Sequence, residues 1–196
     1  MSINLPTTPV CRDATLKVQE FGGAMTGALG GPTRLVRRFG DRMSVLFNYG
    51  AMDADCADAF IAARMRARAE GQTMLGQFPI QPFTASIGSP QIDGADQLGT
   101  LINMKGFTPG TKVTKGWAFS FSASRVYTHV VTGAVVADGD GKAAVHVAPM
   151  FRASPADGAA LNFTAPQIEG FVVEPTDWTI RMLRWKGLSF TLAENA

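Results

Sequence analysis

Two aspartates spaced two residues apart, Asp138 and Asp140 in the stretch ADGDGK, are the most suggestive metal-ligand candidates in the sequence. A calcium loop of the EF-hand type needs oxygen ligands at its first, third and fifth positions and a glutamate at its twelfth. Counted from Asp138, the fifth position is Lys142 and the twelfth is Pro149. Short runs of small and β-branched residues flank the stretch where an EF-hand has helices. The pattern therefore predicts a tight turn between two strands and no metal site.

A catalytic constellation is equally hard to find. The only two histidines, His129 and His146, both lie in runs that predict strands. Such a histidine is more often structural than a ligand or a base, because metal-binding and catalytic histidines come in clusters with other polar groups. Zinc-peptidase, serine-hydrolase and paired-cysteine motifs are missing, and the glycine-rich residues 22–33 match no phosphate-binding pattern. We expect no enzymatic activity and no cofactor.

Length and composition favour a β-rich chain. The 196 residues suffice for one domain or two small ones with their own cores. Only 17 % of the residues are charged, and 21 glycines and 11 prolines suit short strands joined by tight turns. The net charge of +2 is too small to predict nucleic-acid binding. Cys11 and Cys56 have neither metal nor redox spacing, which indicates reduced, structural cysteines.

Targeting signals are not visible in the sequence. The first ten residues lack the basic and apolar regions of a signal peptide, and no apolar run approaches the length of a membrane span. We expect synthesis in a cytoplasm, a soluble protein or a subunit of an assembly, and no membrane insertion.

One segment, near residues 53–70, predicts a helix, with Asp53 placed to cap its start and Gly71 to end it. Its acidic residues come early and its basic residues late, which complements the helix dipole. One stripe at helical spacing is expected to pack on a sheet, while the arginines face solvent or a neighbouring subunit. The stripe is Ala57, Phe60, Ile61 and Met65, and the charged residues include Asp53, Asp55 and Asp58 at the start and Arg64, Arg66 and Arg68 at the end.

A locally basic hairpin is predicted over residues 34–50. Gly40-Asp41 is its expected turn, and apolar residues alternate along the return strand. The charges suit an exposed edge that faces either solvent or another subunit. A nucleic-acid site is less favoured, because no aromatic platform accompanies the charges. The four arginines are Arg34, Arg37, Arg38 and Arg42.

From residue 78 the pattern changes to closely spaced, alternating strands, which predict a small β-barrel or β-sandwich. The final residues resemble the first part of the chain in their aromatic and β-branched content. We therefore predict a β-rich domain of residues 1–79 and 173–196, interrupted by an inserted β domain of residues 80–172. Trp117 and Tyr127 in the insert are candidates for glycan contact, although such rings more often belong to a core.

Three stretches resemble the tail-tip proteins of long-tailed bacteriophages, and among them the distal tail proteins. The first is the basic hairpin and helix within residues 31–72. The second is the Gly-Phe, Pro-Gly and Lys-Gly pattern within residues 101–163, and the third is the closing run RWKGLSFTL at residues 184–192. Together they cover most of the chain from about residue 31 onward.

The resemblance implies a structural virion protein with no catalytic residues. Its β-rich domain would form a ring, typically a homohexamer, that joins the tail tube to the hub and host-adsorption apparatus, with the insert facing outward. Tube, hub and tape measure proteins are the implied partners. The alternative is a minor tail or connector protein whose insert binds cell-surface glycan.

Opposite charges on two different faces would fix the order of subunits in such a ring. The expected interface residues are Arg34, Arg37, Arg38, Arg42, Asp53, Asp55, Asp58, Arg64 and Arg68.

Overall fold

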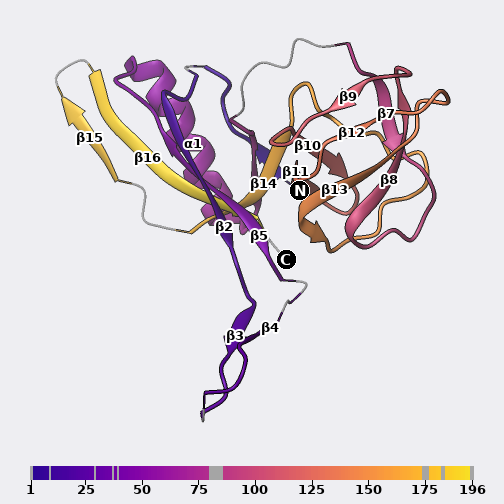
Figure 1. The fold of residues 1–196 in the computed structure, drawn as a ribbon. Coiled ribbons are helices and arrows are strands. Elements are labelled where there is room, and N and C mark those ends of the chain that lie inside the picture. Colours follow the sequence, from indigo (N-terminus) through magenta and orange to yellow (C-terminus); the bar gives the residue numbers. More distant parts are fainter. Residues whose placement is uncertain are drawn as a thin grey trace.

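The computed structural model describes residues 2–8, 10–28, 30–36, 38, 40–79, 86–173, 177–181 and 184–194. As the sequence predicts, the chain is mainly β, with a single helix among these residues. Two large sheets contain most of the strands, and two hydrophobic cores form, one on each sheet. Figure 1 shows the two parts side by side, with a thin hairpin that projects below them.

The first sheet has seven strands, drawn from both ends of the chain. Apart from β1, which runs parallel to β6, its neighbouring strands are antiparallel. Across the sheet the order is β1 (Ser2–Asn4), β6 (Thr73–Gln77), β14 (Gln167–Val172), β16 (Arg184–Glu194), β5 (Arg42–Asn48) and β2 (Asp13–Gln19), and β15 (Asp177–Arg181) also pairs with β16.

The position of β14 differs from the sequence prediction. Residues 167–172 were expected in the insert, but they belong to the seven-stranded sheet. Gln167–Gly170 pair with β6, and Gly170–Val172 pair with β16. The turn-rich composition before β14 resembles that of the insert, so the change of sheet leaves little trace in the sequence.

Helix α1 (Ala54–Glu70) packs on this sheet through aromatic contacts. The ring of Phe60 lies 4.6 Å from that of Tyr49, which lies 5.9 Å from that of Phe190. Gly71 ends the helix as predicted, with a left-handed φ of 60° and its N–H donating to the carbonyl of Ala67. Asp53 occupies the N-cap position but its side chain makes no capping hydrogen bond, contrary to the prediction.

The buried stripe of α1 also differs from the prediction. Ala57, Phe60 and Ala67 are buried, whereas Met65 is 57 % exposed. Alanines and arginines surround most of the helix, so the spacing of its apolar residues gives only a weak indication of the buried face.

The second part, residues 86–166, is a small barrel, hereafter the barrel. Residues 158–162 bridge its two edge strands, through Gln91 to Ala160 on one side and Ser120 to Asn162 on the other. A ribbon of β9 (Lys112–Val113) and β12 (Val135–Val136) lies beside it. The five-stranded sheet has the order β10 (Ala118–Ser122), β11 (Val126–Val131), β13 (Ala143–Phe151), β8 (Gly99–Phe107) and β7 (Gly88–Ile92).

Phenylalanine rings fill the barrel interior. Phe119 stacks on Phe163 and Phe121 on Phe151, each with ring centroids 4.9 Å apart. Phe119 and Phe151 are fully buried, which agrees with the alternation that predicted a strand here.

The Asp138 stretch is a turn between β12 and β13, as predicted. One carboxylate oxygen of Asp138 accepts the N–H groups of Asp140 and Lys142, at 2.9 and 2.8 Å. Gly141 has a left-handed φ of 72°, and a Cβ there would collide with the carbonyl oxygen of Phe107. Asp138 therefore stabilises a turn whose backbone requires glycine.

Candidate subunit interface

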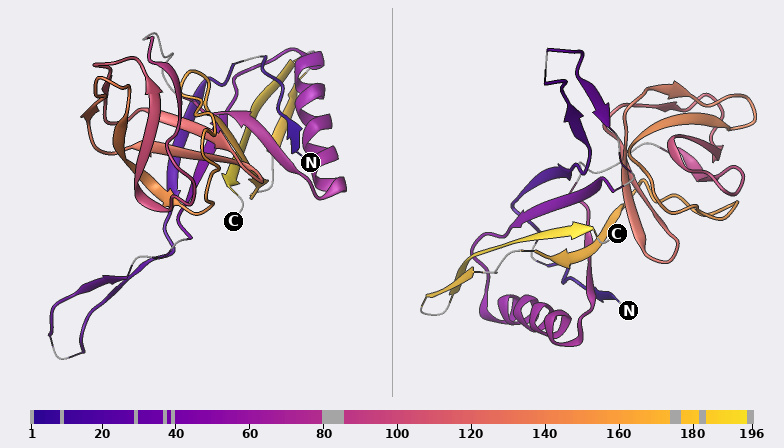
Figure 2. Two further views of the ribbon diagram at one scale, coloured as in Figure 1. Left: turned by 90° about the vertical axis from the view of Figure 1, so that its right-hand side faces the viewer. Right: turned by 90° about the horizontal axis from the view of Figure 1, so that it is seen from below.

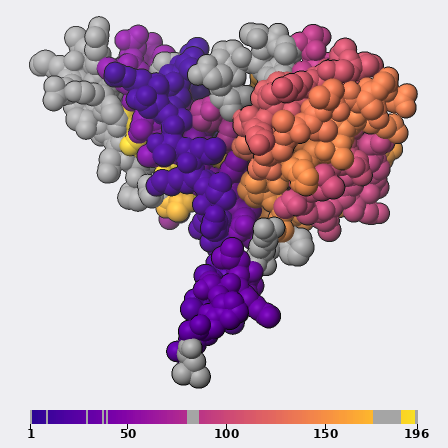
Figure 3. Space-filling model, in the orientation of Figure 1, coloured from indigo at the N-terminus to yellow at the C-terminus, as the bar shows by residue number. Residues whose placement is uncertain are grey.

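The hairpin that projects from the seven-stranded sheet, residues 20–41, is called the arm here. β3 (Gly23–Met25) pairs with β4 (Arg34–Val36), and the arm continues β2 and β5 beyond the sheet. The glycine-rich stretch that begins at residue 22 therefore lies in the arm and its tip. In the space-filling view the arm stands clear of the body (Figure 3).

The arm corrects the predicted hairpin. Gly40-Asp41 is not the turn between two paired strands, because β4 pairs with β3 and not with β5. The two residues are a break in the returning strand, opposite Phe21. The carboxylate of Asp41 accepts the N–H of Phe21 at 2.8 Å, and the guanidinium of Arg42 lies 4.8 Å from the centre of the Phe21 ring. These contacts fix the base of the arm.

Apolar side chains of the arm are unusually exposed. Leu35 is 78 % exposed and Met25 is 67 % exposed, although each lies in a paired strand. Exposed apolar groups that gather on a projecting element are typical of surfaces that another molecule covers.

Strand β2 shows the same feature at the edge of the sheet. Leu16 lies opposite Val45 and Val18 lies opposite Met43, so each pair shares one face of the sheet. Val45 and Met43 are 0 % and 2 % exposed, whereas Leu16 and Val18 are 45 % and 46 % exposed. The row of apolar side chains that faces the core on β5 therefore continues onto β2, but no other part of the described chain covers it fully there.

The structure divides the predicted arginines among three settings. Arg34 and Arg38 are exposed on the arm, and Arg42 is held at the base of the arm by Phe21 and by the carbonyl of Gly40. Arg37 lies outside the described residues. Arg66 forms an ion pair with Glu70 at 2.8 Å.

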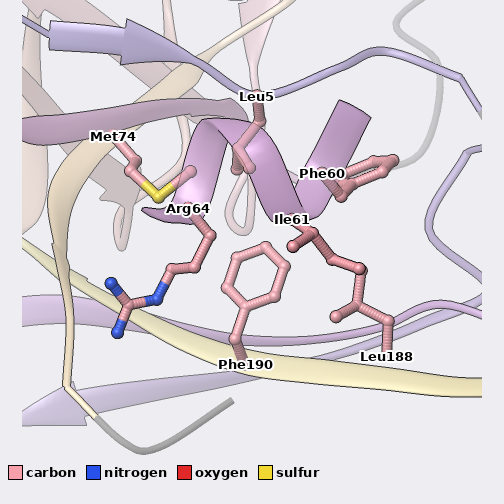
Figure 4. A pocket seen from close by; sticks show the side chains of 7 residues that line it. All are labelled: Leu5, Phe60, Ile61, Arg64, Met74, Leu188 and Phe190. Atoms are coloured by element: carbon pink, nitrogen blue, oxygen red, sulfur yellow. The ribbon is translucent and has the colours of Figure 1, made fainter. Parts of the chain in front are cut away.

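Arg64 and Arg68 lie together at the far end of α1. Burial and the neighbouring charge of Arg68 lower the pKa of Arg64. Figure 4 shows Arg64 beside a cavity of about 10 Å³ between α1 and the sheet, with its guanidinium pointing away from the apolar side chains. Both arginines also border a groove of about 180 Å³ beside Phe171.

The three predicted aspartates, Asp53, Asp55 and Asp58, are exposed at the start of α1. The segment before β2 lies beside the chain that leads from β5 into α1, because the N–H of Arg12 donates to the carbonyl of Asn48 at 3.0 Å and the Arg12 side chain approaches Gly50. Val10 in that segment is 82 % exposed. Val10, Asp53, Asp55 and Asp58 are called the acidic pole below.

A buried polar junction, which the sequence analysis did not detect, joins the barrel to the seven-stranded sheet. Glu194 of β16 accepts the N–H of Thr128 at 2.7 Å and that of Met43 at 3.0 Å. Glu169 of β14 accepts the N–H of Val126 at 2.9 Å. Both glutamates thus bind alternate N–H groups of β11, along the part of that strand that does not pair with β13.

Arg152 of the barrel completes this junction with an ion pair to Glu194 at 2.8 Å. The side chains of Arg152 and Glu194 are only 9 % and 1 % exposed, so each charge depends on the other for stabilisation. Burial raises the pKa of Glu194, and this effect is opposed by its two N–H donors and by Arg152. No local sequence pattern distinguishes these residues from surface charges.

The two predicted glycan contacts lie in or against the barrel core. Tyr127 is only 8 % exposed and stacks on Phe121, with ring centroids 5.5 Å apart. Trp117 is half-buried and makes a T-shaped contact with Phe163, with ring centroids 6.4 Å apart. Tyr127 thus has the core position that the sequence analysis weighed as more frequent, and Trp117 packs against the edge of that core.

The two histidines lie on opposite sides of the barrel wall. His129 is fully buried among phenylalanines, its Nδ1 lies 2.8 Å from the carbonyl oxygen of Pro149, and burial lowers its pKa to about 3. His146 is exposed and packs against Gly133. Within the described residues, no group of three or more histidine, cysteine, aspartate or glutamate side chains is arranged to hold a metal.

A cleft of about 330 Å³ opens on the barrel between β7 and residues 160–164. Its residues are uncharged. Serine, glutamine, asparagine and threonine supply hydrogen-bonding groups, and the buried Ile87, Leu161 and Phe163 supply apolar surface. The residues that line the cleft are Ile87, Gly88, Ser89, Pro90, Gln91, Ala160, Leu161, Asn162, Phe163 and Thr164.

Across the described part of the chain, no helix is both long and apolar enough to cross a membrane. A comparison with models of protein families found no match, and a comparison with curated proteins found none either.

Proposed function

We propose that the chain is a structural subunit of a bacteriophage tail tip, acting as the distal tail protein. In this role the seven-stranded sheet and α1 form a ring of identical copies below the tail tube, and the barrel faces outward. The tail tube, hub and tape measure proteins are its partners in the virion. The protein performs no turnover.

The observation that carries this proposal is the arm. A single chain exposes Leu35 and Met25 on a projecting hairpin and leaves Leu16 half exposed at the edge of the same sheet. A protein that works alone gains nothing from such a surface, whereas a subunit of an assembly buries it. The sequence resemblance to tail-tip proteins adds an independent reason to look for this assembly in a phage tail.

The test is the composition of phage particles produced by the genome that encodes the chain. Mass spectrometry should find the protein in purified particles, and gold-labelled antibodies against the barrel should mark the tip of the tail. The label on capsids, or its absence from intact particles, would contradict the proposal.

The uncharged cleft of the barrel supports a second candidate function, glycan binding by a minor tail or connector protein. Sugar sites combine an apolar floor with uncharged hydrogen-bonding groups, and a volume near 330 Å³ suits a short oligosaccharide. Titration with neutral oligosaccharides, followed by NMR, should shift the amides of Gln91 and Asn162 if this function is real. A panel that produces no shifts would exclude it.

A further inference from the structure

The exposed charges around strand β4 of the arm are basic, whereas the exposed acid Glu20 lies at the base of the arm, next to Gln19, which pairs with Arg42. Arg34 and Arg38 are exposed and form no ion pair with any residue that the structure describes. The acidic residue nearest to them along the arm, Asp41, already accepts the N–H of Phe21. The arm therefore presents free positive charge beside the exposed Leu35.

The acidic pole presents the opposite charge. Asp53, Asp55 and Asp58 are exposed and likewise have no ion-pair partner among the described residues. Arg12 is the basic residue closest to them in the adjoining segment, so the pole remains negative overall. Val10, exposed in the segment beside the chain that leads into α1, gives the pole an apolar component as well.

These two surfaces lie at opposite ends of one strand. β5 begins at Arg42, at the base of the arm, and ends at Asn48, five residues before Asp53. Seven residues of extended strand span about 20 Å. Both views of Figure 2 show the arm pointing away from α1. The arm of a chain therefore cannot reach the acidic pole of that chain, but it can reach the pole of another copy.

We propose that the arm of one copy docks on the acidic pole of a second copy. Arg34 and Arg38 pair with the carboxylates at the start of α1, and Leu35 packs against Val10. The contact rests on the self-assembly that the proposed function requires. It joins two different surfaces, so its repetition produces either a closed ring or an open stack.

Charge sets the direction of this contact, and apolar burial supplies most of its affinity. Exposed ion pairs contribute little individually and are screened by salt, so single charge changes should have mild effects. Changes of several charges at once should weaken association by at least about tenfold, because like charges then face each other across the contact.

Two charge-reversed variants test the docking. The arm variant carries Arg34→Glu and Arg38→Glu, and the pole variant carries Asp55→Lys and Asp58→Lys. Each should remain monomeric in sedimentation velocity at a concentration at which the wild type associates. Mixed together, the two variants should associate again, because each then offers the other an oppositely charged surface.

A barrel variant, Lys112→Glu with Lys115→Glu, is the matched control. It changes the net charge as much as the arm variant does, at exposed positions away from both surfaces, and it should associate like the wild type. Circular dichroism and melting temperature show that all variants fold.

The outcomes separate the docking from the proposed function. If the arm and pole variants associate as well as the wild type, or their mixture does not associate, the docking is wrong while self-assembly stands. A wild type that is monomeric at all concentrations, or whose arm binds tube protein or DNA instead of its own copies, also overturns the docking. The tail-tip role falls only if the protein is missing from the particles.

Discussion

The barrel and the seven-stranded sheet differ in how completely the chain itself buries their apolar side chains. The barrel closes on itself, and its phenylalanines are 0 to 3 % exposed. The seven-stranded sheet is covered by α1 from β1 and β6 to β16 and left open at β2, where Leu16 is 45 % exposed. A closed sheet has no unpaired edge strand and few exposed apolar side chains. An open sheet with apolar residues on its edge strand exposes a surface that a partner can cover.

Under the proposed function, the barrel and its junction carry fold stability and the arm carries assembly. Substitutions in the barrel and its junction should act on the folding of a single chain. Substitutions on the arm should leave that folding unchanged and act on association.

The largest effect is expected at the junction, where Glu194→Ala leaves the Arg152 guanidinium buried without its carboxylate. Removal of one partner of a buried ion pair costs about 3–5 kcal/mol of the free energy of unfolding. Urea denaturation measures this loss. The double variant Glu194→Gln with Arg152→Met should lose less than Glu194→Ala alone, because no buried charge is left unpaired. A double variant that is less stable than Glu194→Ala would argue against a coupled pair.

A cavity in the barrel core should have a comparable effect. Phe119→Ala removes a ring that is 0 % exposed, and such changes cost about 3–5 kcal/mol. Thermal unfolding of the monomer should show a clearly lower midpoint. A loss below about 1 kcal/mol would mean that the barrel can collapse around the missing ring, and the contrast with the open sheet would weaken.

Acid should destabilise the barrel through His129. Its pKa in the folded protein is about 3, below the ordinary value of 6.5. Between these two pH values the unfolded chain binds a proton at His129 and the folded chain does not. The contribution of neutral His129 to the free energy of unfolding is fully present above pH 6.5. It falls by about 1.4 kcal/mol per pH unit as the pH is lowered from 6.5 to 3.

His129→Phe should remove this slope, at the cost of leaving the carbonyl of Pro149 without the ring nitrogen. Urea midpoints at several pH values for both proteins give the comparison, and Glu194 contributes equally to each. Parallel curves for wild type and variant would show that another group causes the acid sensitivity.

The smallest effect on folding is expected on the arm. Leu35→Ser should change the free energy of unfolding of the monomer by less than about 0.5 kcal/mol, because the side chain is 78 % exposed. Its effect should instead appear as weaker association in sedimentation velocity. A large loss of monomer stability would mean that Leu35 packs within its own chain.

Local patterns predicted the features that depend on local chemistry. The Asp138 turn, the Gly71 helix end and the mainly β character follow from turn residues, left-handed glycine and strand periodicity. The alternation around Phe119 likewise indicated a core-facing strand.

Features that depend on distant pairing could not be predicted in this way. The strand partner of β4, the sheet of β14 and the roles of Glu169 and Glu194 all depend on contacts between segments far apart in the sequence. The alternation of Leu16 and Val18 indicates a buried face, but it does not reveal that the chain leaves this face half exposed. The prediction of the buried face of α1 was partly wrong for a local reason, because alanines occupy both faces of the helix and the apolar spacing does not single out one of them.

Hydrogen–deuterium exchange measured over a range of protein concentrations tests the central claim most directly. If the arm is an assembly surface, amides of residues 20–41 and of the segments around Val10 and Asp55 should exchange more slowly as concentration rises. Those of the barrel should not change. Association that protects the barrel while the arm continues to exchange freely would contradict the account.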